Sequence, residues 1–356
     1  MARLPGIVDA DVHHMLSSND LLTPYLPQRW ARYNEQFGLR YPDSIGYFAT
    51  RPRHFACRTD AWPPDGGVPG GDLDFMREQL LDAWPIEAVI LNPINQTTCG
   101  SQFVEFAAAL TRALNDWTQA EWLEQDDRLY SSICVPCEDA TLAAAEVERR
   151  AGNPRFVQVL VNVRTREPLG NRKYWPLYEV AEANGLPLAM HVGGHGGNTI
   201  TGAGWPSYYF EDHAGYPQAF QSQVISLVVE GVFERFPGLK VVLQEGGFAW
   251  LPWLMWRSDM AFELLRDEVA HLERKPSETI REHFWFTTQP IEEPERAEWL
   301  PQLLDELGMP GRALFATDYP HWDFDAPDQA LPLSLGDELR GAIYAGNARA
   351  LYPSLS

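Results

Sequence analysis

The stretch IVDADVHH, residues 7–14, joins a short apolar run to ionisable side chains at every second position. Asp9, Asp11 and His13 alternate with apolar residues, so in an extended strand all three are expected on one face. A face packed against helices would bury these groups without partners, which is costly, so the interior of the sheet is favoured. His14 is expected to point the other way.

Seven further apolar runs follow along the chain, separated by amphipathic stretches. The eight predicted strands are residues 7–10, 87–91, 132–135, 156–161, 187–191, 240–245, 284–288 and 313–317. The helix candidates between them are 74–84, 102–122, 142–151, 174–183, 218–235 and 295–307. This alternation is typical of a parallel sheet covered by helices, and eight strand–helix units predict a closed (β/α)₈ barrel, the TIM-barrel form of the α/β class.

Two connections are longer than an ordinary strand-to-helix loop. The first, residues 15–72, is rich in aromatic side chains and is predicted to be an ordered cap inserted after strand one. The second, residues 193–216, follows strand five. Both are expected at the C-terminal mouth of the barrel, where enzymes of this fold carry their chemistry. Because no linker or repeat interrupts the pattern, residues 1–356 are predicted to form a single domain.

Composition excludes several classes of protein. A formal net charge of -21 argues against nucleic-acid binding, which relies on clustered Lys and Arg. No window offers roughly 18 consecutive apolar residues, so no membrane span is expected. The start of the chain has no signal-like apolar stretch, and its four cysteines are few for 356 residues. A cytoplasmic enzyme with a small-molecule substrate is therefore expected.

Ionisable residues recur where the predicted strands end. His191 ends strand five, Glu245 ends strand six and Asp318 follows strand eight. Helix capping explains a single acid at a strand end, but not histidines at strands one and five together with acids at strands six and eight. Together with Asp11 and His13, these residues predict a metal site.

Three other histidines are candidates for a second metal or for substrate contact. His195 lies four residues after His191 in a glycine-rich loop, and His213 lies in the second long connection. His321 follows Asp318 by three residues, where it could hydrogen-bond a metal ligand. The alternatives for these histidines are solvent exposure and local packing.

Several phrases of the sequence together resemble the amidohydrolase superfamily, in particular the amidohydrolase-2 branch related to aminocarboxymuconate semialdehyde decarboxylase. They are VDADVHH (8–14), ALTRALNDW (109–117), LPLAMHVGG (186–194), GVFERFPGLKVVLQEGGFAWLPWL (231–254), LFATDYPHWDFD (314–325) and AGNARALY (345–352). The resemblance implies a distorted (β/α)₈ barrel with a metal at its mouth. The first-strand HxH of the family falls on Asp11 and His13, its fifth-strand His on His191 and its eighth-strand Asp on Asp318.

Two positions depart from the pattern of that branch. The first His of HxH is Asp11, and the sixth-strand position that is often His in the decarboxylases is Glu245. Strand four also offers no Lys that could bridge two metals, since the nearest, Lys173, is expected beyond the strand. The resulting carboxylate-rich set suits Mn²⁺ or Fe at least as well as Zn²⁺, as one ion or two.

The resemblance implies hydrolysis or nonoxidative decarboxylation of a small, hydrophobic-bodied substrate that carries a carboxylate. Such chemistry uses a metal to activate water and polarise the substrate, with Asp318 as ligand and proton shuttle. His191 and Glu245 are the other catalytic candidates. Glu245 in place of a sixth-strand His weakens the decarboxylase interpretation.

Two alternatives stay open. Two histidines with three or more carboxylates are also the donor set of non-haem di-iron oxygenases, and the resemblance extends to a branch that uses iron and O₂ for hydroxylation. In that monooxygenase, Glu245 would bridge two irons and His195 or His213 would complete the second site. A non-catalytic metal-binding protein is the other alternative. A homodimer through helical faces at 218–235 and 250–265 is a further hypothesis.

Overall fold

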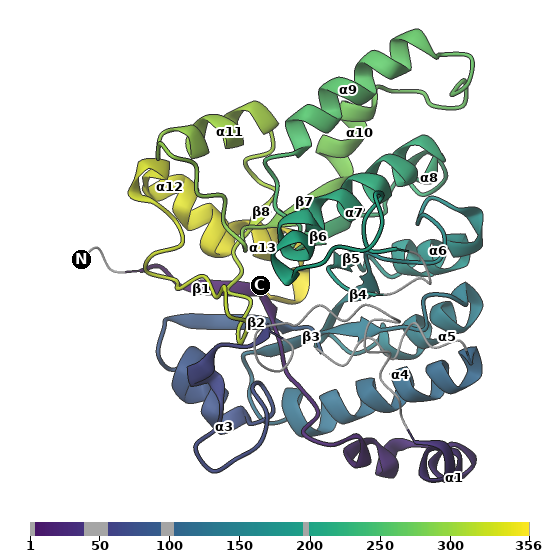
Figure 1. Ribbon diagram of the computed structural model, residues 1–356, viewed down its shortest axis with the longest axis vertical. Helices are drawn as coiled ribbons and strands as arrows, with labels where there is room; N and C mark the ends of the chain where they lie inside the picture. The colour runs from purple at the N-terminus through teal and green to yellow at the C-terminus, as the bar shows by residue number, and fades with distance from the viewer. Residues whose placement is uncertain (1–3, 39–55, 94–102, 195–198, 356) are drawn as a thin grey trace.

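Eight parallel strands form one sheet whose spatial order follows the chain from β1 to β8. The computed structural model describes residues 4–38, 56–93, 103–194 and 199–355. The strands are β1 (Ile7–Val12), β2 (Ile86–Leu91), β3 (Leu129–Cys134), β4 (Phe156–Asn162), β5 (Leu188–His191), β6 (Val241–Gln244), β7 (Phe284–Thr287) and β8 (Ala313–Leu314). They lie at the centre of the molecule with helices around them (Figure 1). The predicted (β/α)₈ barrel is confirmed.

Helices cover the outside of this sheet. The α-helices of the described residues are α1 (Gln28–Phe37), α3 (Leu73–Met76), α4 (Val104–Thr118), α5 (Ala140–Arg150), α6 (Trp175–Ala183), α7 (Tyr209–Val229), α8 (Val232–Arg235), α9 (Leu251–Leu264), α10 (Pro276–His283), α11 (Trp299–Leu307), α12 (Gly336–Gly341) and α13 (Asn347–Leu351). Within the described residues, no helix is both long and apolar enough to cross a membrane.

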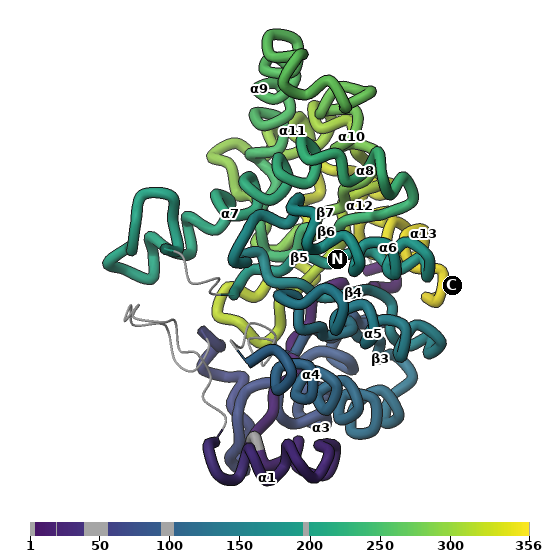
Figure 2. The backbone as a smooth tube through the Cα atoms, turned by 90° about the vertical axis from the view of Figure 1, so that its right-hand side faces the viewer, coloured from purple at the N-terminus to yellow at the C-terminus, as the bar shows by residue number. Residues whose placement is uncertain are grey.

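The helix predicted over 218–235 differs from the observed one at both ends. It begins earlier, at Tyr209, because the Glu211 side chain accepts hydrogen bonds from the backbone N–H groups of Ser207 and Tyr208, both at 2.8 Å. It is interrupted at Gly231, whose φ of 75° only glycine adopts at little cost. The second long connection is therefore shorter than predicted, and residues 199–208, just before α7, project from one side of the molecule (Figure 2).

The barrel is closed by the segment that follows β8. Strand β8 itself is short, because its ladder with β7 ends at Leu314 rather than continuing to Thr317 as predicted. Beyond it, the Ala10 N–H donates to the Phe315 carbonyl at 2.8 Å, and the His13 N–H donates to the Tyr319 carbonyl at 2.7 Å. The segment after β8 therefore runs beside β1. This brings Asp318 close to the predicted ligand His13.

The prediction that Asp9, Asp11 and His13 share one face was wrong for Asp9. The pairing of β1 with β2 shifts register between Asp9 and Val12, which breaks the two-residue alternation. Asp9 instead accepts hydrogen bonds from the N–H and Oγ1 of Thr317, at 3.0 and 2.5 Å. Its carboxyl is fully buried, which raises its pKa to about 8, and it ties β1 to the segment after β8.

The insertion after β1 packs against α4 with its first half. Trp30 and Tyr33 of α1 meet Phe106 of α4 with ring centroids 5.4 and 4.8 Å apart. Further along the insertion, the Arg58 N–H donates to the Pro320 carbonyl at 2.9 Å, next to the segment that carries Asp318. That residues 15–72 act as a cap over the mouth stays a prediction.

Candidate metal centre

Five predicted ligands converge at the carboxyl ends of the strands. His13 Nε2 lies 2.8 Å from Asp318 Oδ1 and 3.6 Å from Asp11 Oδ1. His191 Nε2 lies 3.3 Å from Asp11 Oδ2 and 3.6 Å from Glu245 Oε2. All five side chains are buried. Residues far apart in the sequence thus form one compact cluster of imidazoles and carboxylates.

The hydrogen bonds of the two histidines fix which ring nitrogen faces the cluster. His13 Nδ1 lies 2.6 Å from the Asn92 carbonyl oxygen, and His191 Nδ1 lies 2.7 Å from the Val192 carbonyl oxygen. A carbonyl only accepts, so Nδ1 carries a proton in both rings, and Nε2 presents a lone pair when the ring is neutral, as it is in a metal ligand. Each lone pair faces carboxylate oxygens, an arrangement that becomes favourable when a cation lies between them. The donor set therefore fits a divalent metal ion.

Unsatisfied acceptors support the same conclusion. Asp318 Oδ2 and Glu245 Oε2 are buried and accept no hydrogen bond from the residues that the structure describes. Burying such groups without a partner is costly. Two sets of potential ligand atoms lie within 4.8 Å of one another: Asp11, His13 and His191 form one, and His13, Glu245, Asp318 and His321 form the other. The two sets share His13.

Backbone strain directs two of the acids into the cluster. Glu245 and Asp318 have φ values of 60° and 57°, in the left-handed region that non-glycine residues rarely adopt. Gln244, directly before Glu245, already points inward, because its Nε2 donates to the Ala10 carbonyl at 2.9 Å. Simple alternation would turn Glu245 away from the mouth, and its left-handed backbone turns it back. Strain of this kind concentrates at functional sites.

A buried chain of polar side chains holds Asp11. Asn92 Nδ2 donates to Asp11 Oδ1 at 2.7 Å, and Ser132 Oγ donates to Asn92 Oδ1 at 2.5 Å. Gln158 Nε2 donates to Ser132 Oγ at 2.8 Å, and the Tyr352 hydroxyl donates to Gln158 Oε1 at 2.5 Å. Sequence reasoning missed these residues. Their signal was the presence of Asn, Ser and Gln inside or just after otherwise apolar strands.

The electrostatics of the cluster reflect an excess of negative charge. Burial acts to raise the pKa of Asp11, but the charges of His191 and His13 outweigh it and hold this pKa at about 2. Burial raises the pKa of Asp318 to about 7. Burial and the nearby charge of Asp318 raise the pKa of Glu245 well above its ordinary value. A bound cation would relieve this repulsion.

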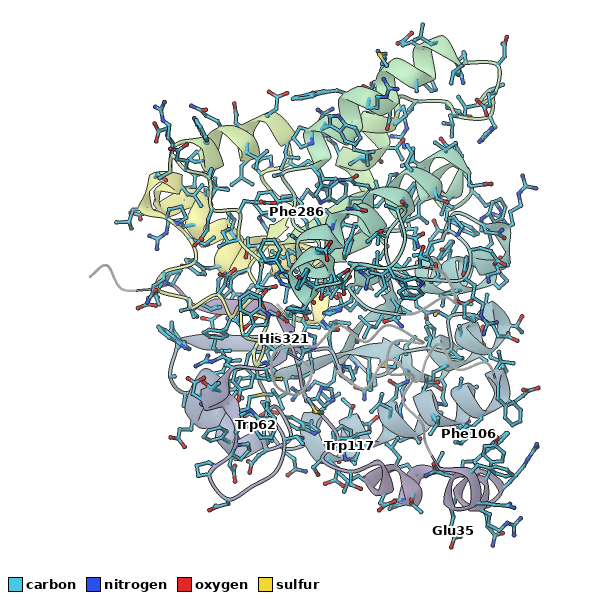
Figure 3. All side chains as sticks on the ribbon, viewed as in Figure 1. Glu35, Trp62, Phe106, Trp117, Phe286 and His321 are labelled. Atoms are coloured by element: carbon cyan, nitrogen blue, oxygen red, sulfur yellow. The ribbon has the colours of Figure 1, made fainter. Side chains whose placement is uncertain are left out.

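The three additional histidines occupy different positions. His321 Nδ1 lies 2.8 Å from Asp318 Oδ1, as its spacing predicted, and His321 is near the middle of the molecule in Figure 3. His213 lies on α7 rather than in a loop, and its Nε2 is 2.9 Å from Asp323 Oδ2. It belongs to neither set of potential ligands. His195 lies outside the described residues.

Two residues excluded from the site are indeed directed away from it. His14 Nε2 lies 2.9 Å from Thr118 Oγ1, and its ring stacks on Trp117 at 5.4 Å. Lys173 lies in the turn before α6, beyond β4, where its Nζ is 2.9 Å from Glu138 Oε2.

Comparison with known proteins agrees with this geometry. The Amidohydro_2 family model, described as amidohydrolase, matches residues 8–354. The chain belongs to this family. A γ-resorcylate decarboxylase from Polaromonas sp. (strain JS666 / ATCC BAA-500) is 28% identical over 327 residues, which cover 84% of this chain and 96% of the relative. A 2-amino-3-carboxymuconate-6-semialdehyde decarboxylase from Dictyostelium discoideum is 23% identical over 320 residues, covering 85% and 81%.

A solved structure matches the amidohydrolase over nearly its whole length. The crystal structure of dihydroxybenzoic acid decarboxylase from Polaromonas sp. JS666, with bound manganese and the inhibitor 2-nitroresorcinol, superposes with a TM-score of 0.67 at 22% identity. The match covers 98% of this chain and 97% of that one. The resemblance found in the sequence is confirmed, and the chain is a metal-dependent hydrolase or decarboxylase rather than a non-catalytic metal-binding protein.

Proposed function

We propose that this amidohydrolase is a nonoxidative decarboxylase of a small aromatic acid that carries a hydroxyl group next to the reacting carboxylate. The observation that carries the proposal is the pair of imidazole Nε2 lone pairs that face buried carboxylates at the barrel mouth. The relatives described above, decarboxylases that align over most of the chain, support the choice of reaction.

The proposed metal ligands are Asp11, His13, His191 and Asp318, with Glu245 beside them. When bound, a divalent ion would polarise the carboxylate and the neighbouring oxygen of the substrate. The carboxylate-rich donor set is hard, which suits Mn²⁺ or Fe²⁺ at least as well as Zn²⁺. The manganese in the related crystal structure supports this choice.

The reaction breaks the bond between a ring carbon and the carboxylate carbon. The electron pair stays on the ring carbon, CO₂ leaves, and a proton must reach that ring carbon. Asp318 is the proposed proton shuttle, because His321 holds one of its oxygens at 2.8 Å while its other oxygen accepts no hydrogen bond from the described residues. Glu245 would orient the substrate where the decarboxylases of this branch often carry an imidazole.

The direct test uses γ-resorcylate in D₂O with manganese-loaded protein. We expect CO₂ release and resorcinol carrying one deuterium at the carbon that held the carboxylate. Asp318→Asn is expected to stop the reaction while the protein remains folded by circular dichroism. Failure to release CO₂ from γ-resorcylate and from a panel of other ortho-hydroxybenzoates would contradict the proposed reaction.

A di-iron monooxygenase is the second candidate. The specific observation in its favour is that two sets of potential ligands lie side by side: Asp11 and His191 belong to one set and Glu245, Asp318 and His321 to the other, so two ions would have separate donors, with His13 bound to one of them. Elemental analysis of protein purified without added metal separates the candidates. Close to two irons per chain with reductant-dependent O₂ consumption would favour the oxygenase, whereas about one Mn²⁺ or Zn²⁺ per chain would favour decarboxylation.

A further inference from the structure

A second pocket lies at the amino end of the barrel, opposite the proposed metal centre. Its volume is about 330 Å³, and none of the proposed metal ligands lines it. Most of its lining comes from the segments directly before β6, β7 and β8, whose amino ends meet at one end of a parallel barrel. Its charged and aromatic residues are Lys240, Glu282, His283, Trp285 and Arg312. We call it the amino-end pocket.

Two cations of the amino-end pocket lie over one aromatic ring. Arg312 Cζ is 3.7 Å from the centre of the Trp285 ring, and Lys240 Nζ is 5.8 Å from it. The sheet fixes both backbones, because the Leu188 N–H donates to the Lys240 carbonyl at 2.8 Å and the Phe286 N–H donates to the Arg312 carbonyl at 3.0 Å. The strands therefore hold two positive charges close to each other.

Neither of these cations has an acidic partner in the part of the chain that the structure describes. Lys240 and Arg312 form no ion pair and no side-chain hydrogen bond there, so their N–H donors are available to a ligand. Glu282, the acid of the pocket, pairs with Arg274 instead. Burial lowers the pKa of Arg312 below its ordinary value, and the charge of Glu282 offsets this effect only in part. An anion bound between the two cations would stabilise both.

The positive charge of this pocket contrasts with the rest of the molecule. The chain carries a formal net charge of -21, so an unpaired cation is expected to find a carboxylate nearby. Arg274 follows that expectation with Glu282, whereas Lys240 and Arg312 do not. His283 adds no negative charge, since its Nδ1 lies 2.9 Å from the Leu239 carbonyl oxygen and its ring is neutral or positive. The pocket therefore favours an anionic ligand.

The number of cations indicates which kind of anion fits. A phosphate group carries about 1.5 to 2 negative charges at pH 7, which balances two cations, whereas a carboxylate balances one. The planar guanidinium of Arg312 can donate paired hydrogen bonds to two phosphate oxygens, and the Lys240 ammonium can bind a third as a point charge. A volume of about 330 Å³ lies at the lower end of the range for small-molecule sites. It suits phosphate or a small phosphate ester.

We propose that the amino-end pocket binds a phosphate group, either as the free ion or as a small phosphate monoester. Arg312 and Lys240 would hold the group, and the pairing of Glu282 with Arg274 would keep the carboxylate of the pocket from repelling it. The site goes beyond the proposed function and does not depend on it, because the pocket contains no proposed metal ligand.

Calorimetric titration of the purified protein with inorganic phosphate, at constant ionic strength, tests the proposal. We expect a dissociation constant of about 1 mM or lower. Acetate, which carries one charge, should bind at least about tenfold more weakly. Glycerol phosphate distinguishes the two sources of the group: binding at least as tight as that of phosphate identifies a monoester site, and weaker binding identifies a site for the free ion.

Two variants each remove one positive charge from the pocket. Arg312→Gln should weaken phosphate binding about tenfold or more, and Lys240→Gln about threefold, because the ammonium makes no paired hydrogen bonds. Arg312→Lys should bind phosphate more tightly than Arg312→Gln. Arg172→Gln is the matched control, since Arg172 also lies over a tryptophan, 5.2 Å from the centre of the Trp175 ring, but outside the pocket. Its phosphate affinity should stay within about twofold of the wild-type value.

Three results would overturn the proposal. They are no phosphate binding by the wild-type protein at about 10 mM, equal binding by the wild-type protein and both pocket variants, and an equal loss in Arg172→Gln. Phosphate bound at the proposed metal centre would persist in Arg312→Gln, so it cannot imitate the expected loss. Melting curves check that each variant folds. Lys240→Gln keeps the test valid if Arg312→Gln is unstable, because Lys240 lies farther from the Trp285 ring.

Discussion

The two ends of the barrel are built from the same strands but have opposite chemistry. Near the amino ends, apolar side chains from β1, β2, β4, β6, β7 and β8 fill the interior, and α13 packs against them. At the carboxyl ends, carboxylates and imidazoles are buried with unsatisfied oxygens. The apolar end stabilises the fold, which allows the mouth to keep charges and strained residues close together.

The largest effect is expected at the mouth. Asp318→Ala removes a proposed ligand that is also the proposed proton shuttle, so the turnover rate should fall to less than about 10⁻⁴ of the wild-type value. His191→Ala should sharply lower the metal content measured by elemental analysis. Both variants should stay folded, because they remove charge rather than core packing. Full turnover in the first variant, or unchanged metal in the second, would move the site elsewhere.

The opposite result is expected at the apolar end. Trp285 lies in the interior cluster, and the Arg312 guanidinium sits over its ring at 3.7 Å. Trp285→Ala should lower the free energy of unfolding by about 3–5 kcal/mol, because it leaves a cavity. Denaturant titration measures this loss, and metal content at low temperature should not change. A marked loss of metal with unchanged stability would show that the two ends are not separate in function.

The buried polar chain connects the two ends and should give an intermediate effect. Asn92→Ala removes the hydrogen bond to Asp11 and the acceptor for Ser132. Metal affinity should fall by about 10–100-fold, as expected when a residue that orients a ligand is lost. Competition with a chelator measures the affinity. Tyr352→Phe removes the hydroxyl group at the other end of this row of buried polar side chains and is the milder control. An equal loss of metal affinity in both variants would contradict an effect that weakens with distance from Asp11.

The sequence predicted the barrel well because its strands are buried on both faces and read as apolar runs. His191, Glu245 and Asp318 could be predicted as ligands because each is an ionisable residue where one of these apolar runs ends. The register shift in β1 could not be predicted, because it depends on pairing with β2 and not on local pattern. The start of α7 was missed for a similar reason, since one Glu211 side chain caps it.

The smallest expected effect is a pH dependence far from the mouth. His283 is buried against Phe233, with ring centroids 4.4 Å apart, and its Nδ1 lies 2.9 Å from the Leu239 carbonyl oxygen. Burial lowers the pKa of His283 below its ordinary value. The unfolded chain therefore takes up a proton near pH 6.5 that the folded chain does not, so the free energy of unfolding falls as the pH drops through that range.

His283→Gln removes this titration while keeping a hydrogen-bond donor near Leu239. Denaturant titrations of both proteins at pH 7.5 and 5.5, with the metal removed by a chelator, should show a smaller loss of stability on acidification in the variant. The groups at the mouth titrate alike in the two proteins, so the difference between them isolates His283. Parallel losses would mean that His283 takes up its proton equally in the folded and unfolded chain. The pH dependence of stability would then come from other titratable groups.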